Sequence, residues 1–442
     1  MALVSLALRR EPSAVLRALA SEPGALLLDV PDPLRPVTLV SCRPVDELRL
    51  PDDEPNPLRR VGKFVARAPL VDATLPFPIA GGVVGYLAYE AGRAVAPRAR
   101  RHPCPLPLAV LRRYDPLLVF DHGTRQWSLV SSTPERARAG WLARLGAETP
   151  LAQGPLAAAP LRAEWDAARY RAAIARIAEY LAAGDVYQVN LTQPFTAALA
   201  APPAALYERL ATRHAVPYGA YLDCGAFQIL ANSPEMLLRR RGERVETRPI
   251  KGTCPRGDDP TSDAALAEAL RASAKDQAEH VMIVDLERND LGRVCVPGSV
   301  TVERLLALES HPTVHHLVSS VRGRLRRDVD VASLLEAVFP GGSITGAPKV
   351  RAMEIIAELE DAPRGVYTGA LGIFDPRGDL ELGLPIRTAV VRDGTLEYQA
   401  GGGIVADSDP DAELAECWLK TAALRRALDP DGATAVALCS SG

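Results

Sequence analysis

The sequence predicts an α+β fold in which strands dominate the first half and helices and strands are mixed afterwards. Short apolar runs separated by proline and glycine, at residues 25–29, 82–89 and 116–120, are typical of strands. Clear helical periodicity begins only after Ala163. Because the helices and strands that follow do not alternate regularly, an α+β arrangement is favoured over a regular βαβ wind.

An alanine-, proline- and arginine-rich stretch at residues 131–161 divides the chain. Apart from a partly helical part around Trp141, it has few residues that build a core. We therefore expect an N-terminal subdomain over residues 1–150 and a second domain over residues 160–430. The 442 residues, of which 48% are hydrophobic, are enough for a substantial buried core.

The second part opens with an amphipathic helix followed by a strand. Apolar side chains recur at helical spacing at Tyr170, Ile174, Ile177 and Leu181, and Gly184 is a suitable stop. Residues 187–192 are expected to form a strand in which Gln188 belongs to a polar face, opposite an apolar face that begins with Tyr187. Further strands are expected near 227–230, 236–239 and 244–247, and helices after Thr261, Ala274, Val331 and Pro348.

Charge balance, the N-terminal segment and the cysteines argue against several classes of protein. The 51 basic and 54 acidic side chains nearly cancel, and no basic block with interleaved aromatic residues indicates a nucleic-acid groove. The apolar run at residues 1–8 precedes Arg9 and Arg10, which reverses the charge order of a secretory signal, and it is too short to span a bilayer. The seven cysteines include no C-x-x-C pair. We expect a cytoplasmic protein without a nucleic-acid or membrane partner, a disulfide framework or a zinc site.

Two pairs of carboxylates have i,i+3 spacing on expected helices, Asp276 with Glu279 and Glu413 with Glu416. Each pair projects from one helical face, so two facing helices would form an oxygen-rich site suited to Mg²⁺. Alternatively, the acids stabilise helix starts, since Ser273 and Asp276 fit a capping box. Glu279 and Glu416 lie deeper in their helices, which makes them the better metal candidates.

A glycine-rich segment at residues 341–348 opens a helix with an apolar stripe. Free N–H groups at a helix start can hold a carboxylate or a phosphate. The segment is not a nucleotide P-loop, because Lys349 follows Pro348 instead of the last glycine. Such a turn is common, so by itself it indicates little.

Three single residues each allow two interpretations. Lys251, in a glycine-containing turn, is either a surface charge or a nucleophile with a lowered pKa. Glu235, in the sequence SPE, is either a solvated acid at a strand end or a general acid with a raised pKa. His316, expected in a helix, is more often a packed core histidine than a catalyst. Spacing alone does not choose between these roles.

Taken together, these segments resemble the chorismate-utilising enzyme family over about residues 160–428. The matching stretches are GDVYQVN at 184–190, SPE at 233–235, PIKGT at 249–253, AEH leading into DLERNDLGR at 278–293, HLVS at 316–319, 339–351, PIR at 385–387, GGGIVADS at 401–408 and 413–420. The N-terminal half resembles the family's first subdomain more loosely, through residues 81–93. The resemblance implies the sandwich fold of anthranilate synthase component I, with two stacked antiparallel sheets and flanking helices, and a chorismate-binding catalytic domain at 160–430.

The resemblance also implies a cofactor and a set of substrate contacts. Glu279 and Glu416 would hold Mg²⁺, with Asp276 and Glu413 reaching it through water. Glu235 and Lys251 would be catalytic. The implied substrate contacts are Gln188, Gly252, Thr253, His316, Ser343, Tyr367, Arg387, Gly401, Gly402, Gly403 and Lys420. Among them, Tyr367 and Arg387 match positions that bind the enolpyruvyl carboxylate of chorismate.

Two positions indicate the product. Gln188 stands where water-using family members carry a lysine base, which implies ammonia as the nucleophile. Lys251 stands where members forming anthranilate carry alanine and members forming 4-amino-4-deoxychorismate, a folate precursor, carry lysine. The resemblance therefore implies that Glu235 protonates the C4 hydroxyl while Lys251 attacks C2, and that ammonia then attacks C4 and expels the lysine.

The chain is expected to need a partner that supplies ammonia. No stretch resembles the Gly-x-Cys-x-Gly turn of a glutamine amidotransferase, so a separate glutamine amidotransferase subunit is expected to supply ammonia. The nearest alternative is an anthranilate synthase component I. A chorismate-binding subunit without catalytic activity is a second alternative, which the presence of Glu235, Lys251, Glu279 and Glu416 together argues against.

Overall fold

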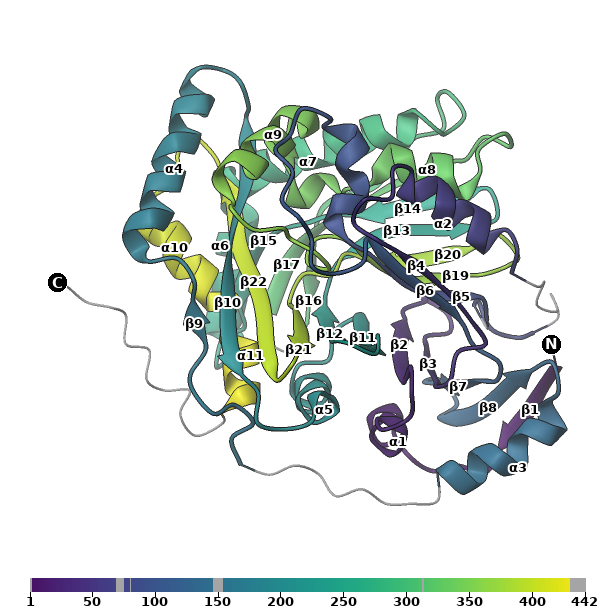
Figure 1. Ribbon diagram of the computed structural model, residues 1–442. Coiled ribbons are helices and arrows are strands. Elements are labelled where there is room, and N and C mark those ends of the chain that lie inside the picture. Colours follow the sequence, from purple (N-terminus) through teal and green to yellow (C-terminus); the bar gives the residue numbers. More distant parts are fainter. Residues whose placement is uncertain (1, 69–74, 80, 146–153, 312–313, 430–442) are drawn as a thin grey trace.

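The computed structural model describes residues 2–68, 75–79, 81–145, 154–311 and 314–429. Its strands form two large sheets, called sheet A and sheet B below, and every strand pairing is antiparallel. Figure 1 shows the helices on the outside of the molecule. The predicted sandwich of two antiparallel sheets with flanking helices is confirmed.

Sheet A has twelve strands. In spatial order they are β1 (Ala2–Leu6), β8 (Gln126–Ser131), β7 (Leu117–Asp121), β3 (Val37–Ser41), β2 (Leu26–Val30), β11 (Tyr218–Asp223), β12 (Gln228–Ser233), β21 (Thr388–Arg392), β22 (Thr395–Ile404), β10 (Gln188–Ala198) and β18 (Gly346–Ala347), and β9 (Arg162–Ala163) also pairs with β10.

Sheet B has ten strands. In spatial order they are β15 (Ile250–Pro255), β17 (Val314–Arg324), β14 (Arg244–Arg248), β13 (Met236–Arg241), β20 (Leu380–Gly383), β19 (Ala370–Phe374), β5 (Val83–Leu87), β6 (Ala109–Arg113) and β4 (Asp46–Leu50), and β16 (Thr301–Ser310) also pairs with β17.

The helices cover the outer faces of the two sheets. They are α1 (Pro12–Leu19), α2 (Pro57–Val65), α3 (Pro134–Arg144), α4 (Ala167–Ala182), α5 (Pro203–Arg213), α6 (Pro260–Ala272), α7 (Ala274–Gly292), α8 (Val331–Val338), α9 (Lys349–Leu359), α10 (Pro410–Leu419) and α11 (Ala422–Leu428), with the 3₁₀ turns η1 (Tyr89–Val95) and η2 (Gly342–Ile344). In Figure 1, α4 and α10 lie beside β10 and β22, whereas α2, α7 and α8 lie above sheet B. No helix among the described residues has the length and apolar character needed to cross a membrane.

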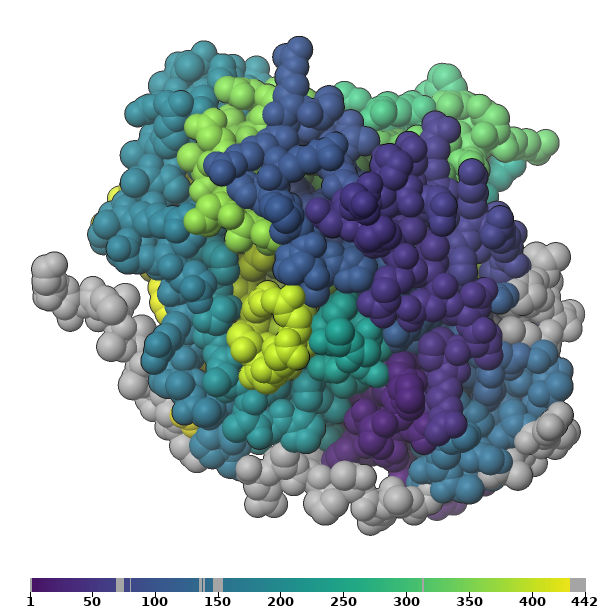
Figure 2. All heavy atoms as spheres, viewed as in Figure 1, coloured from purple at the N-terminus to yellow at the C-terminus, as the bar shows by residue number. Residues whose placement is uncertain are grey.

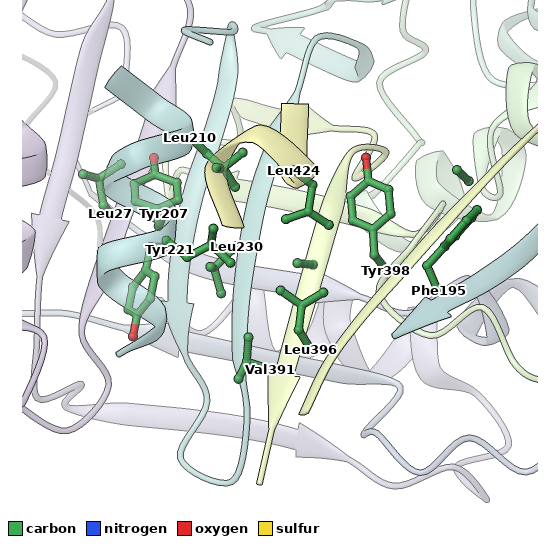
Figure 3. Packing of buried hydrophobic residues seen from close by; sticks show 14 of the residues in the cluster. Leu27, Phe195, Tyr207, Leu210, Tyr221, Leu230, Val391, Leu396, Tyr398 and Leu424 are labelled. Carbon is green, nitrogen blue, oxygen red and sulfur yellow. The ribbon is translucent and has the colours of Figure 1, made fainter. Parts of the chain in front are cut away.

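The apolar core has three parts. One lies between sheet A and the helices α1, α4, α5 and α11, a second lies between sheet B and α2, α7 and α8, and the third lies between the two sheets. In the first part, Tyr207 and Leu210 of α5 and Leu424 of α11 cover the strand residues Tyr221 and Leu230 (Figure 3). Burial of this amount of apolar surface is the main favourable term in folding.

The helix and strand at the start of the second part follow the prediction, with one correction. Asp166 caps α4 by accepting a hydrogen bond from Arg169 N at 2.7 Å, and Gly184 follows the helix with φ +78°. In β10, however, the predicted apolar and polar faces are both buried, and Tyr187, predicted to begin the apolar face, lies just before β10 and is 69% exposed. The reason is that β10 pairs with β22 along its length and lies between helices and the polar site described below.

Two further expectations are corrected. His316 lies on strand β17 and not in a helix. The reason is that the backbone of β17 pairs with β15 on one side and with β16 on the other. The glycine-rich segment does not run directly into a helix; it forms η2 and the short strand β18, and α9 begins at Lys349.

Strands from both predicted domains contribute to both sheets. In sheet A, β2 pairs with β11, and in sheet B, β5 pairs with β19. Residues 146–153, inside the predicted linker, lie outside the described residues. The division at residue 150 therefore stays a prediction from composition.

Candidate active site

Glu235 lies where the chain passes from sheet A to sheet B, between the end of β12 and the start of β13. Its side chain is buried, with 4% of its surface exposed. Ser343 Oγ donates a hydrogen bond to Glu235 Oε1 at 2.6 Å, and Ile250 N lies 3.5 Å from the same oxygen. The glycine-rich turn η2 thus holds this carboxyl group through a single hydroxyl.

The surroundings of Glu235 suit a general acid. Burial raises its pKa to about 7, although the hydrogen bond from Ser343 and the charge of Lys251 act in the opposite direction. A carboxyl group with this pKa keeps its proton in a large part of the molecules near neutral pH. The interpretation of Glu235 as a solvated acid at a strand end is therefore wrong.

Lys251 approaches Glu235 from β15 at the edge of sheet B. A Cβ atom added at Gly403 on β22 would lie 3.1 Å from Lys251 Nζ and 2.1 Å from Gln188 Nε2. The ammonium group and the amide therefore meet above the bare backbone of Gly403, which has room for both only because it has no side chain. Lys251 is partly buried at this point.

Gln188 is fully buried on β10 and points to the same place. Within the described part of the chain, neither its amide nitrogen nor its amide oxygen has a hydrogen-bond partner. A buried amide without partners is costly and uncommon, and is typical of a site whose partner is a ligand. The geometry therefore places an amide, which is not a base, beside Lys251.

The four predicted metal ligands come from two helices, α7 and α10, as expected. Lys275 Nζ lies 3.2 Å from Glu413 Oε1, and Lys420 Nζ lies 2.6 Å from Glu416 Oε1. Ser408 also donates to Glu413 Oε1 at 2.7 Å. No three acidic, histidine or cysteine side chains of the described residues converge as on a bound ion. The carboxylates of α10 are instead neutralised by lysines.

The same carboxylates influence one another through space. Burial raises the pKa of Glu279. The charges of Lys251 and Lys275 lower it, and those of Glu413 and Asp276 raise it further. Burial also opposes the ionisation of Glu416, but its ion pair with Lys420 and the charges of Lys251 and Lys275 together lower its pKa. Carboxylate oxygens are the donor type that a hard divalent cation such as Mg²⁺ prefers.

Two glycines keep the space between these helices and the strands open. A Cβ at Gly402 would lie 2.9 Å from Glu413 Oε2 and 4.0 Å from Glu416 Oε1. Gly252 has φ +77°, and a Cβ there would lie 3.3 Å from Asp276 Cγ. The expected helix-start role of Asp276 is also present in part, since Ser273 caps α7 by accepting from Asp276 N at 3.3 Å.

Thr253 and His316 form the wall next to Lys251. Thr253 Oγ1 lies 2.7 Å from His316 Nδ1, across the β15–β17 pairing. Burial lowers the pKa of His316 to about 4, so the ring is neutral at physiological pH. A neutral imidazole held by a hydroxyl can offer a hydrogen bond to a ligand at its other nitrogen.

Arg387 and Lys420 are held together, and Tyr398, whose hydroxyl donates to the carbonyl oxygen of Lys420 at 3.1 Å, joins them to the cavity that Tyr367 lines. Arg387 Nη1 donates to the carbonyl oxygen of Lys420 at 2.7 Å, and Lys420 Nζ donates to the carbonyl oxygen of Gly401 at 2.7 Å. Tyr367 is buried and lines a small cavity with Thr388 and Tyr398. On the face drawn in Figure 2, the blue segment around residue 100, part of which lines this cavity, lies next to the yellow-green hairpin of β21 and β22.

Two ionisable residues of the site, Lys275 and Glu287, were not predicted from the sequence. Lys275 lies one helical turn before Glu279, and this i,i+4 spacing could have indicated it. Glu287 lies two turns after Glu279 and is buried, where it accepts a hydrogen bond from Thr247 Oγ1 at 2.7 Å. Burial raises the pKa of Glu287 to about 8. Its position in a charged run of the sequence gave no sign of this burial.

Comparison with known proteins places the chain in a family. The family model described as chorismate binding enzyme matches residues 24–426. The chain is 42% identical over 397 residues to anthranilate synthase component 1 of Streptomyces coelicolor, covering 84% of this chain and 77% of that one. It is 40% identical over 362 residues to aminodeoxychorismate synthase component 1 of Bacillus subtilis, covering 79% and 77%.

A solved structure gives the same result for the fold. Anthranilate synthase component I from Streptococcus pneumoniae superimposes with a TM-score of 0.80 at 28% sequence identity, over 90% of this chain and 93% of that one. The family match begins well before residue 160, so it includes the N-terminal half whose resemblance was looser. The chain belongs to the chorismate-binding enzymes.

Proposed function

We propose that the chain is an aminodeoxychorismate synthase component I, which converts chorismate and ammonia to 4-amino-4-deoxychorismate. The observation that carries the proposal is the position of Lys251, whose ammonium group lies over Gly403 beside Gln188 and acts electrostatically on the buried acid Glu235. Relatives of both product types are about equally similar, so the proposal depends on this residue and not on overall identity.

The first chemical step uses Glu235 and Lys251 together. The ammonium group of Lys251 first loses a proton to solvent. Glu235 then donates its proton to the C4 hydroxyl, which leaves as water, and the amine of Lys251 attacks C2. The C4–O bond breaks, the C2–N bond forms, and the ring double bonds shift. A general acid of this kind typically contributes about 10²–10⁴-fold to a rate, and covalent catalysis divides the substitution into two easier steps.

The second step replaces the lysine by ammonia. Ammonia attacks C4, the C2–N bond to Lys251 breaks, the double bonds shift back, and the proton lost by the incoming amine can return to Glu235. The overall change is chorismate plus ammonia to 4-amino-4-deoxychorismate plus water. Gln188 supports this assignment because a neutral amide cannot activate water as a lysine base would.

Binding of the substrate carboxylates would fix the ring over these groups. Mg²⁺, held by Glu279 and Glu416 with Asp276 and Glu413 behind them, would supply positive charge for the ring carboxylate. Arg387 and Tyr367 would bind the enolpyruvyl carboxylate, a task suited to a guanidinium group. Thr253, His316 and the backbone of Gly401–Gly403 would complete the pocket and position C2 near Lys251.

Ammonia would come from a glutamine amidotransferase subunit in the cytoplasm. The relatives named component 1 imply a second component, and the sequence contains no amidotransferase nucleophile motif of its own. With the isolated chain, an ammonium salt would replace the partner. The anthranilate-forming function is the second candidate, because relatives of that type are as similar as the others.

The test is identification of the product. The purified chain is incubated with chorismate, Mg²⁺ and an ammonium salt at mildly alkaline pH, and the products are separated and identified by mass spectrometry. We expect 4-amino-4-deoxychorismate. Without ammonia, intact-protein mass spectrometry should detect a covalent adduct on the wild type that is absent from Lys251→Ala. Anthranilate or isochorismate as the sole product would contradict the proposal.

A further inference from the structure

Lys275 occupies an unusual place for a lysine, in the first turn of helix α7. The N-terminus of a helix carries a partial positive charge, so a cation there is unfavourable. Ser273, and not Lys275, caps this helix. Neither the dipole nor the cap of α7 therefore explains the lysine.

The ammonium group of Lys275 instead reaches across to the other helix of the site. Its Nζ lies 3.2 Å from Oε1 of Glu413 on α10, which is buried, whereas the Lys275 side chain is 46% exposed. The lysine is thus the counter-ion of a carboxylate on the other helix of the site.

The choice of lysine is itself informative. The chain has only five lysines, at positions 63, 251, 275, 349 and 420, and all its other basic side chains are arginines. An arginine would grip a carboxylate with two parallel hydrogen bonds, whereas an ammonium group is a compact point charge on a flexible stem. Another cation can therefore displace the side chain of Lys275 from Glu413 more easily than it could displace an arginine.

The second lysine of the cluster has a simpler explanation. Lys420 forms the C-cap of α10 and pairs with Glu416 one turn earlier. A cation at the C-terminus of a helix is favoured by the helix dipole. Lys275, in the first turn of α7, has no such favourable position relative to the dipole of its own helix.

We propose that Lys275 is an internal counter-ion that a divalent cation displaces from Glu413, so that this lysine sets the affinity of the site for the metal. The inference rests on the assignment of the four carboxylates under the proposed function and adds a residue that competes with the metal. Binding of the cation then requires the exchange of one ion pair for another, and the exposed half of the Lys275 side chain lets it swing out into water.

The test measures metal affinity directly and without chorismate. The purified full-length chain is titrated with Mn²⁺ at fixed pH and ionic strength, and free Mn²⁺ is followed by electron paramagnetic resonance. Lys275→Met keeps the length of the side chain and removes its charge, and Lys275→Arg keeps the charge and strengthens the grip on Glu413. Lys63→Met, which removes one charge from an exposed position on α2, is the matched control.

We expect the dissociation constant for Mn²⁺ to fall about two- to fivefold in Lys275→Met, the range for loss of one half-exposed ion pair. It should rise in Lys275→Arg and stay unchanged in Lys63→Met. An unchanged or higher dissociation constant in Lys275→Met, or tighter binding by Lys275→Arg, would overturn the inference. Absence of Mn²⁺ binding by the wild type would instead overturn the metal assignment itself, and product identity is read in the separate chorismate assay.

Discussion

Ser343 Oγ lies 2.6 Å from Glu235 Oε1, and this hydrogen bond connects the glycine-rich turn to the proposed general acid. Because it stabilises the ionised carboxylate, it lowers the pKa of Glu235 against the larger effect of burial. We expect Ser343→Ala to move the loss of activity with rising pH to higher pH, by up to about one unit for one neutral hydrogen bond. The measurement is kcat/KM as a function of pH.

The limiting case is removal of the acid itself. Glu235→Gln should lose about 10²–10⁴-fold in kcat because it cannot donate a proton to the leaving hydroxyl. Far-ultraviolet circular dichroism and the melting temperature serve as controls for folding.

If the pH profile of Ser343→Ala coincides with that of the wild type, the hydrogen bond does not set the pKa of Glu235 in solution.

Gly403→Ala tests the meeting point of Lys251 and Gln188. The new Cβ would lie 2.1 Å from Gln188 Nε2 and 3.1 Å from Lys251 Nζ, so both side-chain ends must move. A displacement of about 1 Å in a reacting group can cost about 100-fold in rate, and we expect a loss in kcat of that order with little loss of stability. Gly140→Ala, on helix α3 where a Cβ meets nothing closer than 4.0 Å, is the control.

Glu279→Gln tests the metal assignment through activity. Replacing one carboxylate by an amide removes a charged ligand, and the Mg²⁺ concentration for half-maximal activity should rise about tenfold or more. Removal of divalent cations by a chelator should abolish activity, and added Mg²⁺ should restore it. Glu268→Gln, on an exposed position of α6, should behave as the wild type. A normal Mg²⁺ dependence in Glu279→Gln would contradict its role as a ligand.

Glu287→Gln gives a prediction about stability and pH. Burial raises the pKa of Glu287 from 4.5 to about 8. A carboxyl group of this kind stabilises the fold fully below about pH 4.5, and its contribution is lost as the pH rises through about 8. Glutamine has no such loss, so the variant should be more stable than the wild type at pH 8, by on the order of 1–3 kcal/mol, and should differ less at pH 5.

Urea unfolding of both proteins at the two pH values measures this difference. Glu358→Gln, on the exposed side of α9, is a control that should show no such pH-dependent gain. A stability difference that is the same at pH 5 and pH 8 would mean that Glu287 does not retain its proton in the folded protein.

Much of the fold could be predicted because its signals are local. The helix of residues 167–182 has apolar residues at helical spacing, a capping aspartate and a glycine stop, and it forms where the pattern indicates. The strands at 26–30 and 117–121 lie within one residue of the predicted runs. His316 was misplaced because a strand buried on both faces lacks the polar and apolar alternation that identifies strands facing water.

The candidate residues could be named from motifs, but their surroundings could not. The burial of Glu235 results from the crossing between the two sheets, which no local pattern encodes. The ion pair of Lys275 with Glu413 joins residues 138 positions apart. Such long-range contacts are set by tertiary packing, so the pairing of Lys275 with Glu413 became visible only in three dimensions.

The pairing of N-terminal strands with later strands in both sheets has a consequence for fragments of the protein. Residues 160–430 alone would lack β2, the partner of β11, and β5, the partner of β19. Each sheet would then have an exposed edge strand with unpaired backbone N–H and C=O groups. Such edges are templates for aggregation. This segment, which contains all of the proposed catalytic residues, should therefore be insoluble by itself. It should become soluble when the N-terminal strands are supplied, even as a separate chain.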